Sequence, residues 1–350
     1  MKPRKLAPDW FEMPANIDFE DLHLIPVTSS HWVQDHDAVV STLDFLHGGG
    51  MNPGQSVQSD VASTPKFGWM DACWLERHWR RKTAVCYGLM TPDESRELGC
   101  LYVFPTYKHG FDADVFVWVR NEERKLGLDE RLYRFAEEWV PQVWPLKNIS
   151  WPGRKISWED WYALPEKDPR PYEGKHAYMT SPRELAPDTF KVPTRIETAK
   201  FVLVPLTMSM EAAALDHKAY ILNKDHINKV FMPDYDWSNG LTLMDAIIDI
   251  SAIDLDWYCR SEFVYSIRTP DELNQIGRFY IQPTRKIGYD AEVHFWVGTG
   301  NGETKLDDDM SSFAHQWIRD VWPFHHLAWP GRDISWDDWN KIPDYEPDPA

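Results

Sequence analysis

An eleven-residue phrase occurs twice in this chain and constrains its fold more than any other feature. Residues 151–161 read WPGRKISWEDW, and residues 329–339, which lie 178 positions later (329 − 151), read WPGRDISWDDW. The same offset aligns residues 90–119 with residues 268–297 without a gap. Seven pairs of tryptophans keep this spacing, so the pairs account for 14 of the 19 tryptophans. A repeat of this length indicates a duplicated domain.

The length of the chain agrees with a duplication, because 350 residues is about twice the size of a typical domain. We expect an N-terminal unit over residues 1–164, a proline-rich linker over residues 165–198 and a C-terminal unit over residues 199–350. In each copy of the phrase a Pro-Gly pair permits a tight turn. The two tryptophans three positions apart then fit one helical turn that covers the core.

Hydrophobic runs and turn residues give the order of elements within a unit. Residues 23–28 and 201–207 are short apolar runs that predict a first strand in each unit, followed by a helical stretch. Three β-rich segments at 83–92, 98–107 and 112–120 are separated by turn signals and predict an antiparallel meander.

A helix and a last strand complete each unit. Apolar residues at helical spacing predict a helix from Leu128 to Val143, with Asp129 as its capping residue. Residues 147–152 then predict a strand that the crossover helix places parallel to its partner. We therefore expect an α+β fold of two tandem units, each a mixed, mostly antiparallel sheet flanked by helices, related by a pseudo-twofold axis.

Composition excludes several classes of protein. The formal net charge of −18 disfavours binding to a nucleic-acid backbone and slightly favours a cationic substrate. No apolar run is long enough to span a membrane, and the N-terminus lacks the apolar core of a secretory signal. The four cysteines form no CxxC pair, so we expect reduced thiols and no metal site. These features predict a cytoplasmic protein without nucleic-acid or membrane partners. Because we expect the two repeated units to pack against each other as an internal pseudo-dimer, we expect the chain to be a monomer.

The stretch LGCLYVFPTYKHGFDADVFVWVRNEERKLGLDERL at 98–132 resembles the GCN5-related N-acetyltransferase (GNAT) superfamily in its third and fourth strands, pyrophosphate loop and following helix. The resemblance covers most of each unit in outline. It implies acetyl-CoA or another acyl-CoA as a substrate, with its pyrophosphate held by main-chain N–H groups at the helix N-terminus. The residues that it places around the cofactor are Val117, Val119, Arg124, Lys125, Gly127, Leu128 and Asp129.

The resemblance is weaker in the second unit. Lys305 stands opposite Gly127, and three aspartates follow at 307–309, where their carboxylates would repel phosphate groups. We therefore expect any CoA ligand in the first unit.

Acyl transfer to an amine also needs a base, and the resemblance directs attention to the carboxylates near the cleft. Asp114 and Glu292, at matching positions of the two units, are our candidates for a base or a substrate anchor, although such residues are also common on solvated strand faces. Glu76 and His78 are further candidates, with a surface or capping role as the alternative.

The function favoured by the sequence is a GNAT-like, acyl-CoA-dependent N-acyltransferase that acts on a small amine, and the acidic net charge slightly favours a cationic one. The alternative is a CoA-independent enzyme, or a protein that binds a small molecule, on a degenerate GNAT scaffold.

Overall fold

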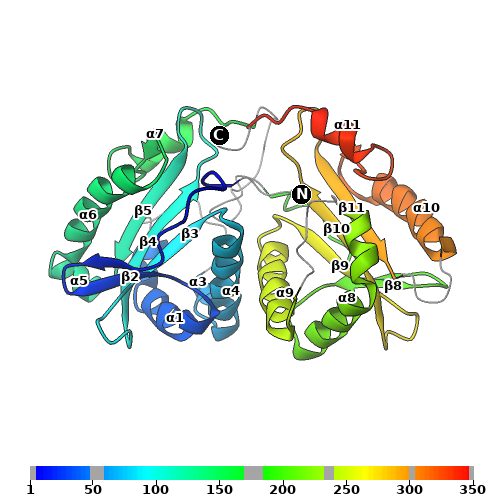
Figure 1. Cartoon of the computed structure of the whole chain (residues 1–350), viewed down its shortest axis with the longest axis horizontal. Coiled ribbons are helices and arrows are strands. Elements are labelled where there is room, and N and C mark those ends of the chain that lie inside the picture. The colour runs from blue at the N-terminus through cyan, green and yellow to red at the C-terminus, as the bar shows by residue number, and fades with distance from the viewer. Residues whose placement is uncertain (1–4, 48–58, 169–183, 232–239, 299–303, 347–350) are drawn as a thin grey trace. The chain divides into compact units, whose positions relative to one another are not determined.

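The computed structural model describes residues 5–47, 59–168, 184–231, 240–298 and 304–346. The chain divides near residue 184 into two compact units, each of which contains one six-stranded sheet (Figure 1). In the first sheet the strands lie in sequence order: β1 (Ile17–Phe19), β2 (Leu22–Pro26), β3 (Val85–Met90), β4 (Glu97–Pro105), β5 (Ala113–Val119) and β6 (Ile149–Ser150). In the second sheet they are β7 (Ile196–Glu197), β8 (Val202–Pro205), β9 (Phe263–Arg268), β10 (Gln275–Pro283), β11 (Ala291–Val297) and β12 (Leu327–Ala328).

All neighbouring strands are antiparallel except the last pair of each sheet. β5 pairs parallel with β6 only at Ala113 and Asp114, and β11 pairs parallel with β12 only at Ala291 and Glu292. The two sheets therefore have the same topology, and the expected fold of two tandem mixed sheets is confirmed. The expected pseudo-twofold relation between the units stays a prediction.

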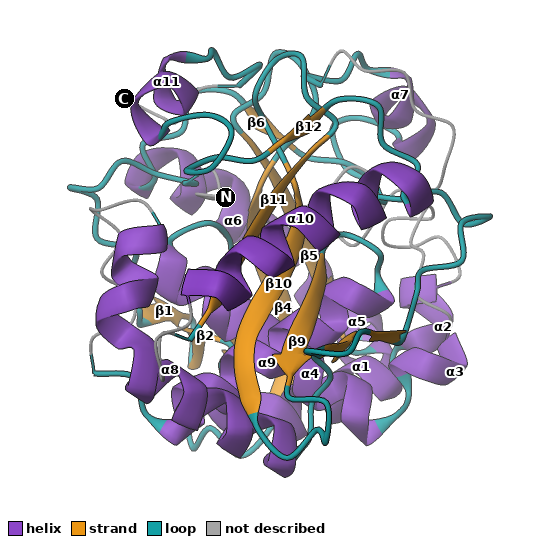
Figure 2. Cartoon of the chain, turned by 90° about the vertical axis from the view of Figure 1, so that its right-hand side faces the viewer, coloured by secondary structure: helices purple, strands orange, loops and turns teal. Residues whose placement is uncertain are grey.

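Helices cover both faces of each sheet. The first unit has a short 3-10 turn, η1 (Ser29–His31), and helices α1 (Trp32–Val40), α2 (Leu43–Phe45), α3 (Ser59–Ala62), α4 (Pro65–Arg81), α5 (Asn121–Lys125), α6 (Leu128–Val143) and α7 (Trp158–Ala163). The second unit has α8 (Met210–Val230), α9 (Leu243–Tyr258), α10 (Thr304–Val321) and α11 (Trp336–Lys341). Figure 2 shows α10 lying across one face of the second sheet.

The main core of the first unit lies between its sheet and α6. Leu128, Leu132, Ala136 and Val140 recur every fourth residue on α6 and are buried against alternate residues of β3, β4 and β5. Val143, which we expected on the same face, is exposed in the last turn of the helix. A second core of the same kind lies beneath α10.

Two short elements escape prediction from the sequence. β1 and β7 precede the expected first strands and form hairpins with them, but they have only three and two residues, too few to show a period. The cap of α6 also differs from the prediction. The N-cap is Gly127, at a φ of 78°, and the Asp129 carboxylate binds elsewhere.

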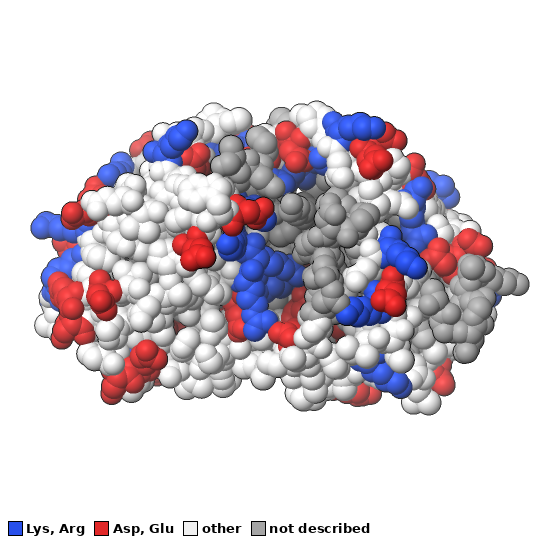
Figure 3. All heavy atoms as spheres, viewed as in Figure 1, with Lys and Arg blue, Asp and Glu red and all other residues white. Residues whose placement is uncertain are grey.

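The surface and the thiols agree with the composition. Figure 3 shows acidic and basic side chains interspersed on one face of the molecule. Within the described ranges, no helix combines the length and the apolar character needed to cross a membrane. The four cysteines are buried and form no disulfide bond.

Candidate functional site

The connection from β5 to α6 forms the candidate site of the first unit. β5 ends at Val119, the single turn α5 follows, and the chain then reverses direction at Gly127 before α6 begins. Only glycine adopts this left-handed backbone without strain. A Cβ atom at Gly127 would have one neighbour within 4 Å, the end of Arg131, so the approach to this turn is open.

Two arginines converge on one carboxylate beside this turn. Arg154, from the first copy of the repeated phrase, donates to Asp129 Oδ2 at 2.5 Å. Arg124 Nε lies 3.9 Å from Asp129 Oδ1, and both atoms are buried without a hydrogen-bond partner. The rest of the Arg124 guanidinium binds the Val119 carbonyl at 3.1 Å and stacks on Phe45, 3.3 Å from the ring centroid.

The charges at this point favour an anion. Both arginine side chains are about one quarter exposed, at 26%, and Asp129 is 14% exposed. Burial lowers the pKa of Arg124, with Asp129 acting in the opposite direction and Arg154 adding repulsion. No side chain caps the first turn of α6. The N–H groups of this turn therefore lie beside the guanidinium groups of Arg124 and Arg154 and the single carboxylate of Asp129.

The second unit repeats the aspartate–arginine pair without the second arginine. Arg332 and Asp307, each 178 positions beyond Arg154 and Asp129, form a bidentate ion pair with both distances at 2.9 Å. α10 runs through Lys305, the counterpart of Gly127, so the glycine turn is absent. Residues 299–303, which include the counterpart of Arg124, lie outside the described residues. In this unit, the Asp307 carboxylate thus accepts two hydrogen bonds from the Arg332 guanidinium.

The other residues predicted around a cofactor divide between core and surface. Val117, Val119 and Leu128 are buried in the main core, which leaves only their main chains for a ligand. Lys125 is exposed at the end of α5.

Asp114, the predicted base of the first unit, is buried beneath α7. Its Oδ1 accepts a hydrogen bond from Trp161 Nε1 at 3.2 Å. Burial raises its pKa to about 6, which hydrogen bonds from Thr106 and Trp161 partly offset. Beside it, Trp158 stacks on Phe116 of β5 with centroids 5.7 Å apart, so α7 covers the strand beyond its pairing with β6.

The remaining candidates have partners other than Asp114. Glu76 and His78 lie on α4, where the Glu76 carboxylate accepts hydrogen bonds from the Ser29 main chain and from Arg80. His78 Nδ1 lies 2.6 Å from Thr83 Oγ1, and burial lowers its pKa well below the usual value. Glu292, in the second unit, is buried with an oxygen 3.5 Å from His294 Nε2.

Sequence reasoning missed Arg154 as a site residue. We interpreted the Trp-Pro-Gly-Arg phrase as a turn, which it is, and assigned no role to its arginine. The available signal was the pairing of Arg154 with Asp129 and of Arg332 with Asp307 at one offset, because both members of the pair recur in both units.

No protein-family profile and no curated protein matches this sequence. Among solved structures, a ribosomal-protein-S5-alanine acetyltransferase from Vibrio fischeri is 15% identical over 37% of this chain and 68% of its own length, with a TM-score of 0.31. The microcin C7 self-immunity acetyltransferase, in complex with acetyl-CoA and AMP, is 13% identical over 37% of this chain and 69% of its own, with a TM-score of 0.29.

A ribosomal L7/L12 alpha-N-protein acetyltransferase, in complex with coenzyme A, is 12% identical over 37% of this chain and 68% of its own, with a TM-score of 0.28. Each of these three solved structures to which the chain is similar is described as an acetyltransferase.

Proposed function

We propose that the first unit binds an acyl-CoA at the N-terminus of α6 and transfers the acyl group to a small amine. The observation that supports this is the convergence of Arg124 and Arg154 on the single carboxylate of Asp129, next to an open glycine turn. A diphosphate would accept charge-assisted hydrogen bonds from both guanidinium groups and from the first N–H groups of α6.

The buried Arg124 Nε without a hydrogen-bond partner fits this ligand, whereas the Asp129 carboxylate opposes it. Binding would therefore require Arg154 to exchange its ion pair with Asp129 for contacts with the phosphates. In the second unit the satisfied Arg332 and the adjacent aspartates do not fit a diphosphate.

The reaction itself makes modest demands on the protein. The amine nitrogen attacks the thioester carbonyl, a C–N bond forms and the C–S bond breaks. The base takes the proton that the amine loses, and the departing CoA thiolate gains a proton to become the thiol. Asp114 stays the proposed base, since a pKa of about 6 leaves it ionised at neutral pH. Trp161, which holds the Asp114 carboxylate, would have to move for a substrate to reach it.

A specific observation favours the alternative of CoA-independent function. Both units close the N-terminus of their long helix with an aspartate–arginine pair from the chain itself, including the unit that lacks the second arginine. The pair would then be a structural link between the repeated phrase and the helix.

Substitution of Asp129 separates the two proposals. If the first unit binds acyl-CoA, Asp129→Asn removes the opposing charge and should tighten acetyl-CoA binding about tenfold, while Arg124→Gln should weaken it by a similar factor, the usual scale for a charge-assisted hydrogen bond. Calorimetric titration with acetyl-CoA measures both. Asp307→Asn is the matched control in the second unit and should leave the affinity unchanged.

A structural link predicts a different result. Asp129→Asn and Asp307→Asn would then lower the melting temperature alike, and neither would alter ligand binding. Absence of any binding heat from the unmutated chain at millimolar acetyl-CoA would rule out the acyl-CoA proposal.

A further inference from the structure

A buried cluster of acidic and thiol groups lies on the face of the first sheet that is opposite α6. Asp35 of α1 meets Glu97 and Cys100 of β4, and the exposed fraction of each residue is 2% or less. Their potential ligand atoms all lie within 4.8 Å of one another. Cys100 Sγ is 2.9 Å from Glu97 Oε1 and 3.9 Å from Asp35 Oδ1.

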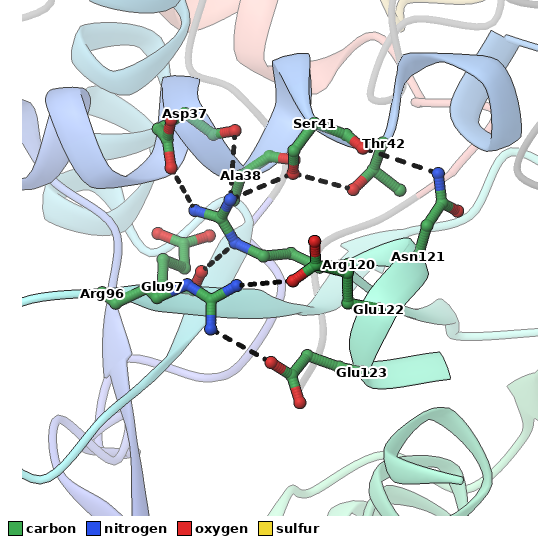
Figure 4. A network of polar contacts seen from close by, with 10 residues as sticks. All are labelled: Asp37, Ala38, Ser41, Thr42, Arg96, Glu97, Arg120, Asn121, Glu122 and Glu123. Atoms are coloured by element: carbon green, nitrogen blue, oxygen red, sulfur yellow. Dashed lines mark hydrogen bonds and ion pairs between the residues drawn. The ribbon is translucent and has the colours of Figure 1, made fainter. Parts of the chain in front are cut away.

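Each of the two carboxylates in this cluster keeps one oxygen without a partner. Asp35 Oδ2 and Glu97 Oε2 are buried and make no hydrogen bond, while the other oxygen of each carboxylate contacts the Cys100 thiol. Figure 4 shows where the neighbouring Arg120 binds: its guanidinium contacts the main-chain carbonyl of Glu97 at 2.6 Å, together with Asp37 and Ser41. Buried carboxylates in this state are costly unless a cation or a proton joins them.

The second unit carries a related cluster with its own cation, although the residue 178 positions beyond Asp35 is Ala213. Gln275 and Arg278 occupy the positions of Glu97 and Cys100, 178 residues later. Arg278 donates to Asp216 at 2.7 and 2.5 Å and to the half-buried Asp249 at 2.9 Å, and Gln275 also donates to Asp216. Asp249 is the counterpart of Asp71, whose charge acts on Asp35 in the first unit. The duplicated site thus has a guanidinium in one unit, and a thiol with an additional carboxylate in the other.

We infer that Asp35, Glu97 and Cys100 bind one divalent transition-metal ion of the Zn²⁺ type, which replaces the guanidinium of the second unit. Two oxygens and one sulfur suit Zn²⁺, whose ligand bonds of about 2.0–2.3 Å require neighbouring ligand atoms about 3.5 Å apart. The observed separations of 2.9 and 3.9 Å lie on either side of that value. Cys86 of β3, whose thiol interacts with that of Cys100, lies outside this set of three mutually close ligand atoms.

This inference departs from the expectation of no metal, which was based on spacing along the sequence. The ligands come from positions 35, 97 and 100, so no short motif contains all of them. Metal binding would deprotonate Cys100 and stabilise the fold, since the site forms only in the folded chain. A proton shared between Asp35 and Glu97 is the competing explanation, and burial does raise the pKa of Asp35, to about 8.

Metal titration of the full chain distinguishes the two explanations. After removal of metal by a chelator, we expect one equivalent of Zn²⁺ to bind and to raise the melting temperature. One equivalent of Co²⁺ should produce a thiolate-to-cobalt charge-transfer band in the near ultraviolet. Cys100→Ser should lose that band, whereas Cys259→Ser, a buried thiol of the second unit, should keep it.

The decisive variant copies the second unit into the first. Glu97→Gln combined with Cys100→Arg gives the first unit the counterparts of Gln275 and Arg278. The variant should therefore fold, bind no Zn²⁺ and show no rise in melting temperature when Zn²⁺ is added. An unmutated chain that binds neither Zn²⁺ nor Co²⁺ at 100 μM, or a double variant that retains one equivalent, would overturn the inference. If Cys100→Ser does not fold, the double variant still tests whether the first unit binds the metal.

Discussion

Asp114 illustrates how burial changes the role of a single residue. In the sequence, Asp112 and Asp114 are two carboxylates that alternate along a predicted strand. Nothing in that pattern distinguishes a catalytic base from a solvated surface group. In the structure its side chain is covered by α7 and accepts a hydrogen bond from the Trp161 indole. Trp161, one of the repeated tryptophans, was predicted to cover the core. Its hydrogen bond to Asp114 joins residues 47 positions apart, so no local sequence pattern predicts it.

The raised pKa of Asp114 predicts a specific pH dependence. Between about pH 4 and pH 6 the folded chain holds a proton that the unfolded chain has released, so the free energy of unfolding falls as pH rises through this window. Asp114→Asn removes this effect and can still accept the Trp161 hydrogen bond. The stability of the variant relative to the unmutated chain should increase by about 3 kcal/mol from pH 4 to pH 7 and stay constant above it. Urea unfolding at each pH measures the difference, and parallel profiles would contradict the expected protonation.

At the scale of elements, the repeated phrase combines three structural tasks in one turn. Gly153 adopts a φ of 74°, the tryptophans begin α7, and the arginine reaches back to the first turn of α6. The turn and the helical tryptophans follow from residue type and spacing, so the sequence predicts them. The ion pair joins residues 25 positions apart, so its geometry depends on how the helix packs on the sheet.

Replacement of Gly153 tests how tightly this turn packs. A Cβ atom there would lie 2.7 Å from Trp158 Nε1, so Gly153→Ala must shift the indole as well as strain the backbone. Gly110→Ala is the matched control in the same unit, because Gly110 has a φ of 86° and no atom within 4 Å of an added Cβ. We expect about 1 kcal/mol of destabilisation for Gly110→Ala and about twice that for Gly153→Ala in urea unfolding. Equal losses would mean that the indole moves without cost.

At the scale of the whole molecule, the duplication makes most of the fold predictable. Strand order, the parallel last strand and the helix over the core follow from patterns that occur twice, so each unit supports the interpretation of the other. The buried cluster around Asp35 was missed for the same reason. Its members differ between the units, and a search for matching residues passes over the positions where Cys100 replaces an arginine.

The buried tryptophans that open the repeated phrase should support their two units equally. Trp151 packs against Tyr133 and Trp329 against His315, and both indoles are buried. Trp151→Ala and Trp329→Ala should each lower the free energy of unfolding by about 3–5 kcal/mol, the usual cost of emptying a large core site. Trp10→Ala, at an indole that is 72% exposed, is the control and should change it by less than about 0.5 kcal/mol. Hydrogen exchange located by peptide would show whether each loss stays within its own unit.

The brevity of the outermost strands has a consequence for how this chain behaves at high concentration. β1 has three residues, and β6, β7 and β12 have two each, so these outermost strands present only a few main-chain groups to a neighbouring molecule. The nine-residue strands β4 and β10 lie in the middle of each sheet, where both sides are paired, whereas β5 and β11 extend beyond their two-residue pairing with β6 and β12. β4 and β10 are thereby protected from edge-to-edge association and from growth into fibrils.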